Sequence, residues 1–402
     1  MKRGKDSIWG QRDFLIVWFG QTISTFGSRL TYVALYWWLL DEKSTAALAT
    51  AATLTAIPAL FLGPIAGAIV DRVDRRRLML VINLASAALV TVAATLLFAG
   101  LLREWMVYVI NPLIAIGMLF YRPALQASIP NLVSSEQLTR ANSFHQISNS
   151  IVSIGGWGLG GMLVGWIGSG PTMWVDAATF AVAGATLFFA AFASPRSCNG
   201  RGVAAIFRDT WHGLQHLVRE RFLFCLVALF GLINLILAPT AVLFPVMAKE
   251  VLEIGAEGFG AFNSAVSAGM LIGGLFTAAL KRVRRHSIWI LGALIAIGLC
   301  LAGFGVSRQL VISLGLLVVV GVGVVIVNIF ETVVFQSRVP NAMQGRIFAA
   351  QEAVCTGIQP LSLAITAGLL TLTSAPIILI VSGLAVAVVG LAAFAVRDLR
   401  SL

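Results

Sequence analysis

The chain has 402 residues, of which 58% are hydrophobic and only 11% are charged. Soluble globular proteins carry about 25% charged residues, so this composition excludes a soluble fold and indicates an integral membrane protein. The formal net charge of +11 would suit nucleic-acid binding, and the placement of the basic residues along the chain decides that question below.

Apolar runs long enough to cross a bilayer recur along the whole chain. Backbone groups in lipid must form hydrogen bonds within the segment, so we expect each run to be a helix. The first half is expected to contain helices at residues 14–40, 45–70, 78–101, 105–129, 143–167 and 172–193. The second half is expected to contain helices at residues 222–246, 259–280, 287–306, 310–335, 348–373 and 376–396. The predicted fold class is an all-α integral membrane protein with twelve transmembrane helices.

Lys and Arg residues divide unequally between the two sides of this topology. Of the 28, 22 lie at the two termini or in the connections after the even-numbered helices. Only Lys43, Arg103, Lys249 and Arg308 lie in the other connections. Because basic loops stay in the cytoplasm, both termini are expected there. The basic character of the chain therefore reflects membrane orientation, and we expect no nucleic-acid partner.

The chain contains an internal repeat. The segment "LFLGPIAGAIVDRVDRR" (60–76) aligns with "MLIGGLFTAALKRVRRH" (270–286) at an offset of 210 residues, and the same offset aligns "QASIPN" with "QSRVPN". Two matches at one offset predict two parallel six-helix repeats. We expect an N-terminal bundle at 1–193, a cytoplasmic linker with an amphipathic helix at 194–221, and a C-terminal bundle at 222–402.

Twelve spans in two repeats, with a charged connection after the second span, resemble the major facilitator superfamily. The family's loop signature matches Gly67, Asp71, Arg72, Arg75 and Arg76, and Asp74 stands where the family has glycine. Within the family the chain looks most like the macrolide- and siderophore-efflux branch of bacterial drug exporters. The segments that carry this likeness are "FGQTISTFGSRLTYVALYWWLL", "IPNLVSSEQLTRANS", "WVDAATFAVAG" and "VPNAMQGRIFAAQEA".

The resemblance implies a gate in that connection. The arginines alone are explained by membrane orientation, but an acidic residue adds little to topology and leaves Asp71 unexplained. In the family the matching aspartate holds the cytoplasmic side closed against the start of span 11. Arg346 lies at that start and is the expected partner of Asp71.

Two arginines fall inside the predicted spans, where a charge costs about 2.5 to 3.5 kcal/mol on insertion scales. Arg29 shares a helix face with Tyr32 and Tyr36, which indicates a water-filled cavity. It either forms a structural pair with a buried carboxylate or takes part in substrate binding or proton transfer. Arg122 stands where many family members carry an arginine tied to proton coupling, although its side chain could instead extend to the cytoplasmic surface.

Three carboxylates are candidates for proton coupling. Glu331 lies deep in span 10 and is the strongest candidate, with Arg122 or Arg29 as a partner when it is deprotonated. Glu352 lies near the start of span 11, where the helix dipole would favour a carboxylate in any case. Asp176 is expected near the outer start of span 6, where capping the helix is the simpler explanation.

Polar positions in the middle of spans 5 and 10 complete the expected substrate cavity. Asn149 belongs to a small and polar stripe on span 5, and Asn328 shares a face with Glu331. In the same span 5, "GGWGLGG" (155–161) partly matches the family's antiporter motif, but Trp157 stands where proline is usual.

These observations predict a monomeric secondary exporter in the bacterial cytoplasmic membrane. It would move an amphipathic small molecule, such as a drug, a macrolide-like compound or a siderophore, in exchange for protons. No phosphate-binding or hydrolytic motif is present, so we expect neither an enzyme nor a cofactor. A lipid or lysolipid transporter and a non-transporting receptor or scaffold are the alternatives.

Overall fold

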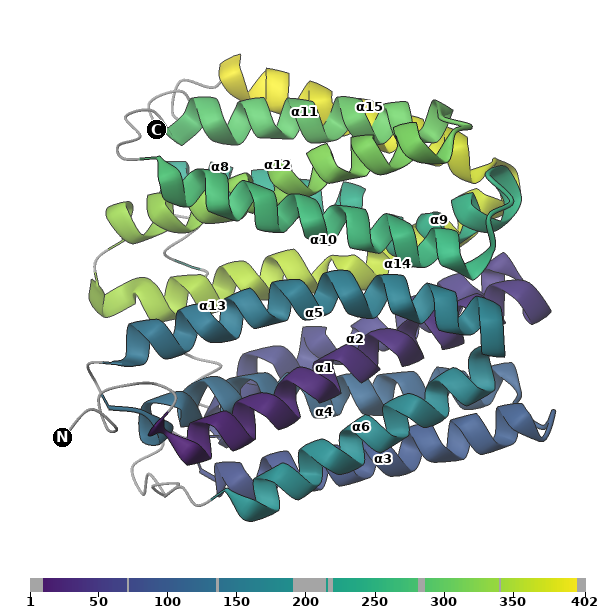
Figure 1. The fold of residues 1–402 in the computed structure, drawn as a ribbon. Helices are drawn as coiled ribbons and strands as arrows, with labels where there is room; N and C mark the ends of the chain where they lie inside the picture. The colour runs from purple at the N-terminus through teal and green to yellow at the C-terminus, as the bar shows by residue number, and fades with distance from the viewer. Residues whose placement is uncertain are drawn as a thin grey trace.

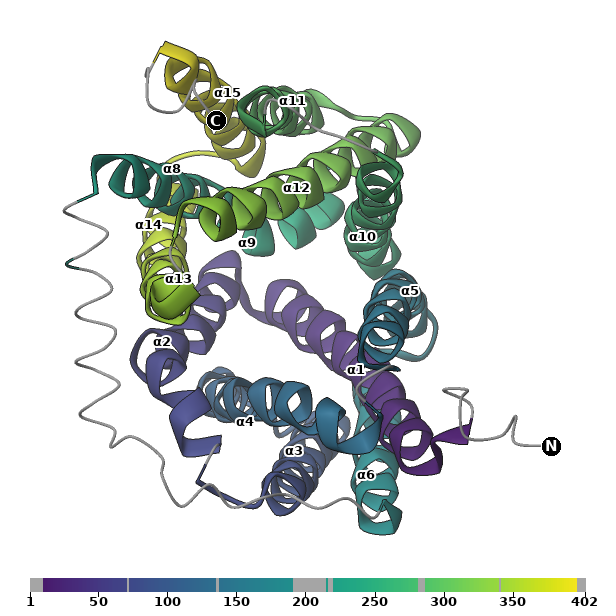
Figure 2. The same ribbon diagram turned by 90° about the vertical axis from the view of Figure 1, so that its left-hand side faces the viewer.

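The computed structural model describes residues 10–70, 72–134, 137–190, 215, 220–280, 286–339 and 341–395. Within these residues it contains two helical bundles packed side by side (Figures 1 and 2). The first bundle consists of α1 (Arg12–Trp38), η2 (Leu39–Lys43), α2 (Thr45–Val70), α3 (Arg75–Phe98), α4 (Glu104–Leu132), α5 (Leu138–Ile167) and α6 (Ser169–Phe189). The second consists of α8 (Arg221–Leu237), α9 (Thr240–Val246), η4 (Met247–Val251), α10 (Gly255–Ala279), α11 (His286–Val306), α12 (Leu310–Arg338), α13 (Asn341–Gly357), α14 (Gln359–Leu372) and α15 (Ala375–Ala395).

Eleven of the helical segments in the described residues are long and apolar enough to cross a membrane. The first helix, α1, is not among them, although its 27 residues would extend about 40 Å. It carries a row of polar side chains, including Gln21, Ser28 and Arg29, which lowers its hydropathy. α1 packs against α5 and α6, which are both among the eleven, and it occupies the position of the first expected span.

Two of the expected spans are broken rather than continuous. The seventh span divides into α8 and α9 at Pro239, and the eleventh into α13 and α14, where Pro360 lies in the first turn of α14. Proline lacks the backbone N–H that would continue the hydrogen-bond pattern of the preceding turn. Each broken segment still forms one candidate span, Phe222–Val251 and Ala350–Leu372, so the two predicted spans are confirmed and each contains a break.

The packing of the helices repeats between the two bundles. The contacts of α2 with α4, and of α3 with α4 and α6, recur as contacts of α10 with α12, and of α11 with α12 and α15. At their C-terminal ends, α1 continues into the π-helical turn η2 and α9 into the π-helical turn η4. Between the bundles, α5 lies beside α10, and α2 lies beside α13 and α14 (Figure 2). The predicted parallel repeat is confirmed by these matched contacts.

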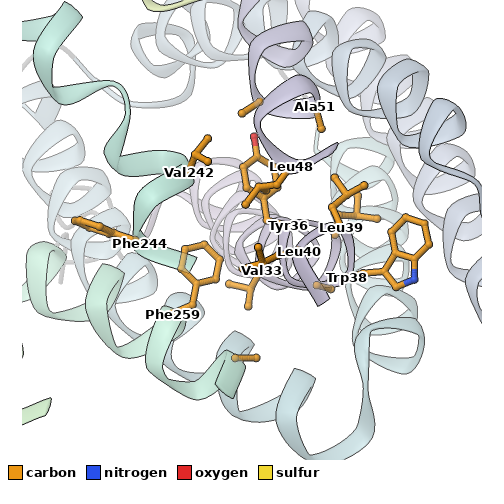
Figure 3. Close-up of a cluster of buried hydrophobic side chains, with 14 of the residues drawn as sticks. Val33, Tyr36, Trp38, Leu39, Leu40, Leu48, Ala51, Val242, Phe244 and Phe259 are labelled. Carbon is orange, nitrogen blue, oxygen red and sulfur yellow. The ribbon is translucent and has the colours of Figure 1, made fainter. Parts of the chain in front are cut away.

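Among the described residues, the buried cluster that combines both bundles lies toward one end of the molecule. We call the end where α1 begins and α15 ends the termini end, on the left in Figure 1, and the opposite end the far end. A buried cluster near the far end combines Leu48 from the first bundle with Val242 and Phe259 from the second (Figure 3). Nearer the termini end, the clusters around Met79 and around Phe335 each lie within one bundle.

Polar contacts also join the bundles at the far end. Lys249 forms an ion pair with Asp41 at 3.0 Å and donates a hydrogen bond to the backbone oxygen of Leu40 at 2.9 Å. Nearby, the hydroxyl of Thr45 donates to the carboxylate of Glu250 at 3.3 Å. The far end is therefore closed by both apolar and polar contacts.

Candidate substrate cavity

A cavity of about 220 Å³ lies within the first bundle, and it is lined by α1, α2 and α4. Nine of its residues lie on α1: Gln21, Ser24, Thr25, Ser28, Arg29, Thr31, Tyr32, Leu35 and Tyr36. The others are Thr55 on α2 and Asn111, Ile114, Ala115, Met118, Tyr121 and Arg122 on α4. The lining therefore combines hydroxyl and amide groups, aromatic rings and aliphatic side chains with two arginines. Such a mixture suits a ligand with both apolar and polar parts.

Arg29 is held between α1 and α5. Its guanidinium carbon lies 5.0 Å from the centre of the Trp157 ring, a cation–π distance. Gly156 makes room for the side chain, because a β-carbon there would lie 3.1 Å from Cβ and Cγ of Arg29. The Nε atom of Arg29 is buried and makes no hydrogen bond. This arginine is positioned by packing rather than by a charged partner.

Aromatic rings continue from Arg29 toward the second bundle. Tyr32 stacks on Tyr36 with 4.0 Å between ring centres, and Trp157 meets Tyr32 edge-on at 5.1 Å. Phe259 on α10 lies 6.4 Å from both Tyr32 and Trp157. Phe259 does not line the cavity itself, but it contacts the lining residue Tyr32, so movement between the bundles would change the packing behind one wall.

Arg122 lines the same cavity from α4 and is exposed. The cavity therefore reaches the protein surface on the side of Arg122, which lies toward the termini end of its helix. Asn111 is on the same face of α4, three helical turns away. Among the predicted substrate residues, Arg29 and Tyr32 line this cavity, and Arg122, predicted for proton coupling, joins them there.

The other two residues predicted for the substrate cavity do not line it. Asn149 on α5 is half-buried, and its side-chain nitrogen lies 3.1 Å from the Nε2 atom of His145. Asn328 is exposed on α12. Neither side chain contributes to the space between α1, α2 and α4.

The carboxylates Glu331 and Glu352 lie in the second bundle, where α12 meets α13. Glu331 is half-buried and accepts a hydrogen bond from the side-chain amide of Gln351. Glu352 is exposed and accepts from the hydroxyl of Thr356 at 2.9 Å. Within the described part of the chain, no ion pair joins either carboxylate to Arg29 or Arg122.

Asp176 is buried on α6, behind α1 as viewed from the cavity. Its carboxylate lies beside Gly27, where a β-carbon would be 2.3 Å from Oδ1, and the same Oδ1 accepts from Thr179 at 3.0 Å. The other oxygen, Oδ2, is buried without a hydrogen-bond partner. Because α6 begins at Ser169, Asp176 lies about two turns inside the helix. The expectation that it caps the helix was wrong.

The residues of the predicted gate lie around the connection between α2 and α3. Asp74 caps α3 by accepting from the backbone N–H of Arg77 at 3.0 Å, which explains an acidic residue at the family's glycine position. Arg75 donates to the backbone oxygen of Ala127 on α4 at 2.8 Å. Arg76 donates to two backbone oxygens at the end of α6, at 2.8 and 2.6 Å. These contacts fasten the connection within the first bundle.

The structure describes the other predicted gate residues only in part. Gly67 is exposed near the end of α2, with nothing within 4 Å of an added β-carbon, and Arg72 is exposed just after that helix. Asp71 lies outside the described residues, as does most of the predicted linker at 194–221. Arg346 is in the second turn of α13, a helix that packs against α2, and its side chain is not described.

Comparison with known proteins agrees with this architecture. The sequence profile of the Major Facilitator Superfamily matches residues 17–362. The chain is 26% identical to macrolide efflux protein A of Streptococcus pyogenes over 361 residues, which is 88% of each protein. It is also 26% identical to the multidrug efflux pump Tap of Mycolicibacterium fortuitum over 364 residues, 87% of each.

Solved structures give the same fold. The nucleoside transporter NupG superposes with a TM-score of 0.75 at 13% identity, over 94% of this chain and 98% of NupG. A bacterial homologue of the iron transporter ferroportin in an inward-facing state superposes with a TM-score of 0.70 at 17% identity. The superposition covers 95% of this chain and 98% of that structure. With eleven candidate spans beside α1 in the described residues, a repeated bundle and a family match over most of its length, the chain belongs to the major facilitator superfamily of membrane transporters.

Proposed function

We propose that this protein exports an amphipathic small molecule across the bacterial cytoplasmic membrane by alternating access, driven by protons that move inward. The observation that carries the proposal is the cavity of α1, α2 and α4, which is closed toward the far end and reaches the surface beside Arg122. The efflux names of the relatives support outward movement. The protein would act as a monomer, because one chain supplies both bundles.

The distribution of basic residues supports the direction of access. If the 22 Lys and Arg residues of the termini and even-numbered connections face the cytoplasm, then the termini end is the cytoplasmic end. The described conformation would then take up substrate from the cytoplasm. Release to the outside would require the far-end contacts of Lys249 and Asp41 to break.

Glu331 is the proposed coupling carboxylate. It lies within a membrane-spanning helix, so its charged form depends on a local partner, and the amide of Gln351 supplies one in this conformation. Rearrangement of α12 against α13 would remove that hydrogen bond and favour the protonated form. Arg122 and Arg29 are the proposed partners in other conformations, with Glu352 and Asp176 as alternative proton carriers.

The experiment is transport in proteoliposomes that contain the purified protein. Ethidium, erythromycin and a carboxylate-bearing dansyl dye should be tested, with a pH gradient imposed in the direction that drives antiport. At least one compound should accumulate against its gradient, and a protonophore should abolish this accumulation. E331Q should reduce accumulation at least about tenfold while equilibration down a gradient continues. Wild-type accumulation in E331Q would exclude Glu331 as the coupling residue.

A further inference from the structure

Both arginines of the cavity lack a charged partner. Across the described residues, neither Arg29 nor Arg122 forms an ion pair or donates a hydrogen bond, and the cavity lining contains no Asp or Glu. Arg29 has a buried Nε atom without an acceptor, although a guanidinium has five N–H donors in a fixed planar arrangement. Two cations that share one cavity repel each other, and a bound anion would relieve this repulsion.

The nearest carboxylates do not fill this role. Asp176 does not line the cavity; its Oδ1 lies against Gly27 of α1 and accepts from Thr179 on its own helix. Glu331 and Glu352 are bonded to Gln351 and Thr356 in the second bundle. The positive charge of the cavity is therefore available to a ligand in the conformation that is closed at the far end.

The rest of the lining indicates what the anionic group is attached to. Ile114, Ala115 and Met118 form an aliphatic strip on α4, and Tyr32 and Tyr36 add aromatic surface opposite the strip. Trp157 covers one face of the Arg29 guanidinium, which leaves the N–H edge of the group for a planar acceptor such as a carboxylate.

We propose that the cavity selects amphiphiles that carry a carboxylate or another oxyanion, which Arg29 and Arg122 bind while the apolar part lies along α4 and the tyrosines. This inference rests on the proposed function and narrows its substrate class. It also has an energetic consequence for export. The inside-negative membrane potential favours outward movement of an anion by about 50-fold for each elementary charge and 100 mV.

Binding of three matched dyes tests the inference without requiring transport. N-dansyl-11-aminoundecanoic acid, its methyl ester and N-dansyl-1,11-diaminoundecane share one dansyl group and one alkyl chain, and they differ in carrying a carboxylate, a neutral ester or an ammonium group. Dansyl fluorescence would be titrated against the protein in nanodiscs of zwitterionic lipid, so that the lipid surface does not select by charge.

The carboxylate dye should bind at least about tenfold more tightly than the ester, and the ammonium dye should bind most weakly. R29Q and R122Q should each weaken carboxylate binding far more than ester binding and so remove most of this preference, and R29K should retain part of it. R308Q, at an exposed arginine outside the cavity, is the control and should match the wild type. R122Q alters an exposed side chain, so it remains informative if R29Q does not fold.

Equal binding of the three dyes, preference for the ammonium dye, or absence of binding would overturn the inference. Retention of the carboxylate preference in both R29Q and R122Q would also overturn the inference. The exporter proposal fails separately, if no compound accumulates in proteoliposomes under a pH gradient. A carboxylate preference without proton-driven transport would therefore remove the exporter and keep the anion site.

Discussion

The position of Arg29 depends on one glycine of the neighbouring helix. A methyl group at Gly156 would lie 3.1 Å from the Arg29 stem and 3.3 Å from the backbone oxygen of Phe26, closer than ordinary van der Waals contact. At Gly155, by comparison, the nearest atom to a β-carbon is a ring carbon of Phe26 at 4.0 Å. The two adjacent glycines therefore provide a matched pair for mutagenesis.

G156A should weaken binding of the carboxylate dye several-fold, because the new methyl group displaces the Arg29 stem or separates α1 from α5. G155A should leave dye affinity unchanged. Both substitutions replace glycine by alanine within a helix, which on propensity alone stabilises the helix by up to about 1 kcal/mol. Dye titration together with thermal unfolding of each variant in the same nanodiscs separates the two effects. Equal affinity for G156A and G155A would contradict the proposed packing.

At this scale the sequence could predict part of the cavity. Arg29 and Tyr32 were predictable, because a charge and polar side chains on one face of a membrane helix require a polar environment. Trp157 could be recognised only as a departure from a family motif, since its contact with Arg29 depends on how α1 and α5 pack. Asn149 and Asn328 were predicted from helix faces, but a face does not specify which neighbouring helix or cavity it meets.

For whole helices, too, the sequence predicts only part of the structure. The expected spans agree with the observed helices to within five residues, because apolar runs and charged ends are read directly from the sequence; the exception is the eleventh, where α13 begins at Asn341 and the expected span at 348. The breaks at Pro239 and Pro360 were not predicted. Pro112, Pro123 and Pro130 all lie inside the continuous helix α4, so a proline alone does not reveal whether a membrane helix ends there.

The helices that flank the predicted gate, α2 and α13, are in contact with each other. α2 ends at Val70, directly before Asp71, and Arg346 lies near the start of α13. If Asp71 pairs with Arg346 as proposed, D71N should slow export several-fold without loss of membrane insertion, because it removes the charge that forms the pair. D74N should have little effect, since asparagine caps a helix as well as aspartate does.

Coupling between the two gate residues is measured by a double-mutant cycle with D71N and R346Q. Transport rates that combine non-additively support a direct contact. Fully additive effects would exclude Arg346 as the partner of Asp71 and leave the N-terminus of α13 as the remaining candidate.

At the scale of the whole molecule, the 210-residue offset predicted the repeated packing of the two bundles. It could not predict which end of the molecule is closed, because both bundles carry comparable apolar faces at both ends. The shared cluster around Leu48 and Phe259 and the pairing of Lys249 with Asp41 become apparent only in the structure.

The basic connections are predicted to face the cytoplasm, and cysteine labelling tests this orientation. Cysteines introduced at Arg77 and Arg284, in a background without the four native cysteines, should react with an impermeant thiol reagent only after the cells are opened. Cysteines at Lys43 and Arg103 should react in intact cells, because few basic residues lie on that side. Labelling of the first pair from outside intact cells would reverse the orientation and with it the proposed direction of access.

Alternating access requires that the far end opens during each cycle. An exposed ion pair such as that of Lys249 and Asp41 contributes about 0.2 to 1 kcal/mol, so thermal motion and substrate binding can break it. A covalent link at the same place would prevent opening. In the cysteine-free background, D41C combined with K249C brings two thiols to the positions of this pair, within reach of a short bis-thiosulfonate crosslinker.

The most direct test of the account is therefore export by this double-cysteine variant before crosslinking, after crosslinking, and after reduction of the crosslink. We expect crosslinking to abolish export and reduction to restore it, while each single-cysteine variant is unaffected by the same treatment. Full export by the crosslinked protein would show that the far end need not open, and it would contradict transport by alternating access.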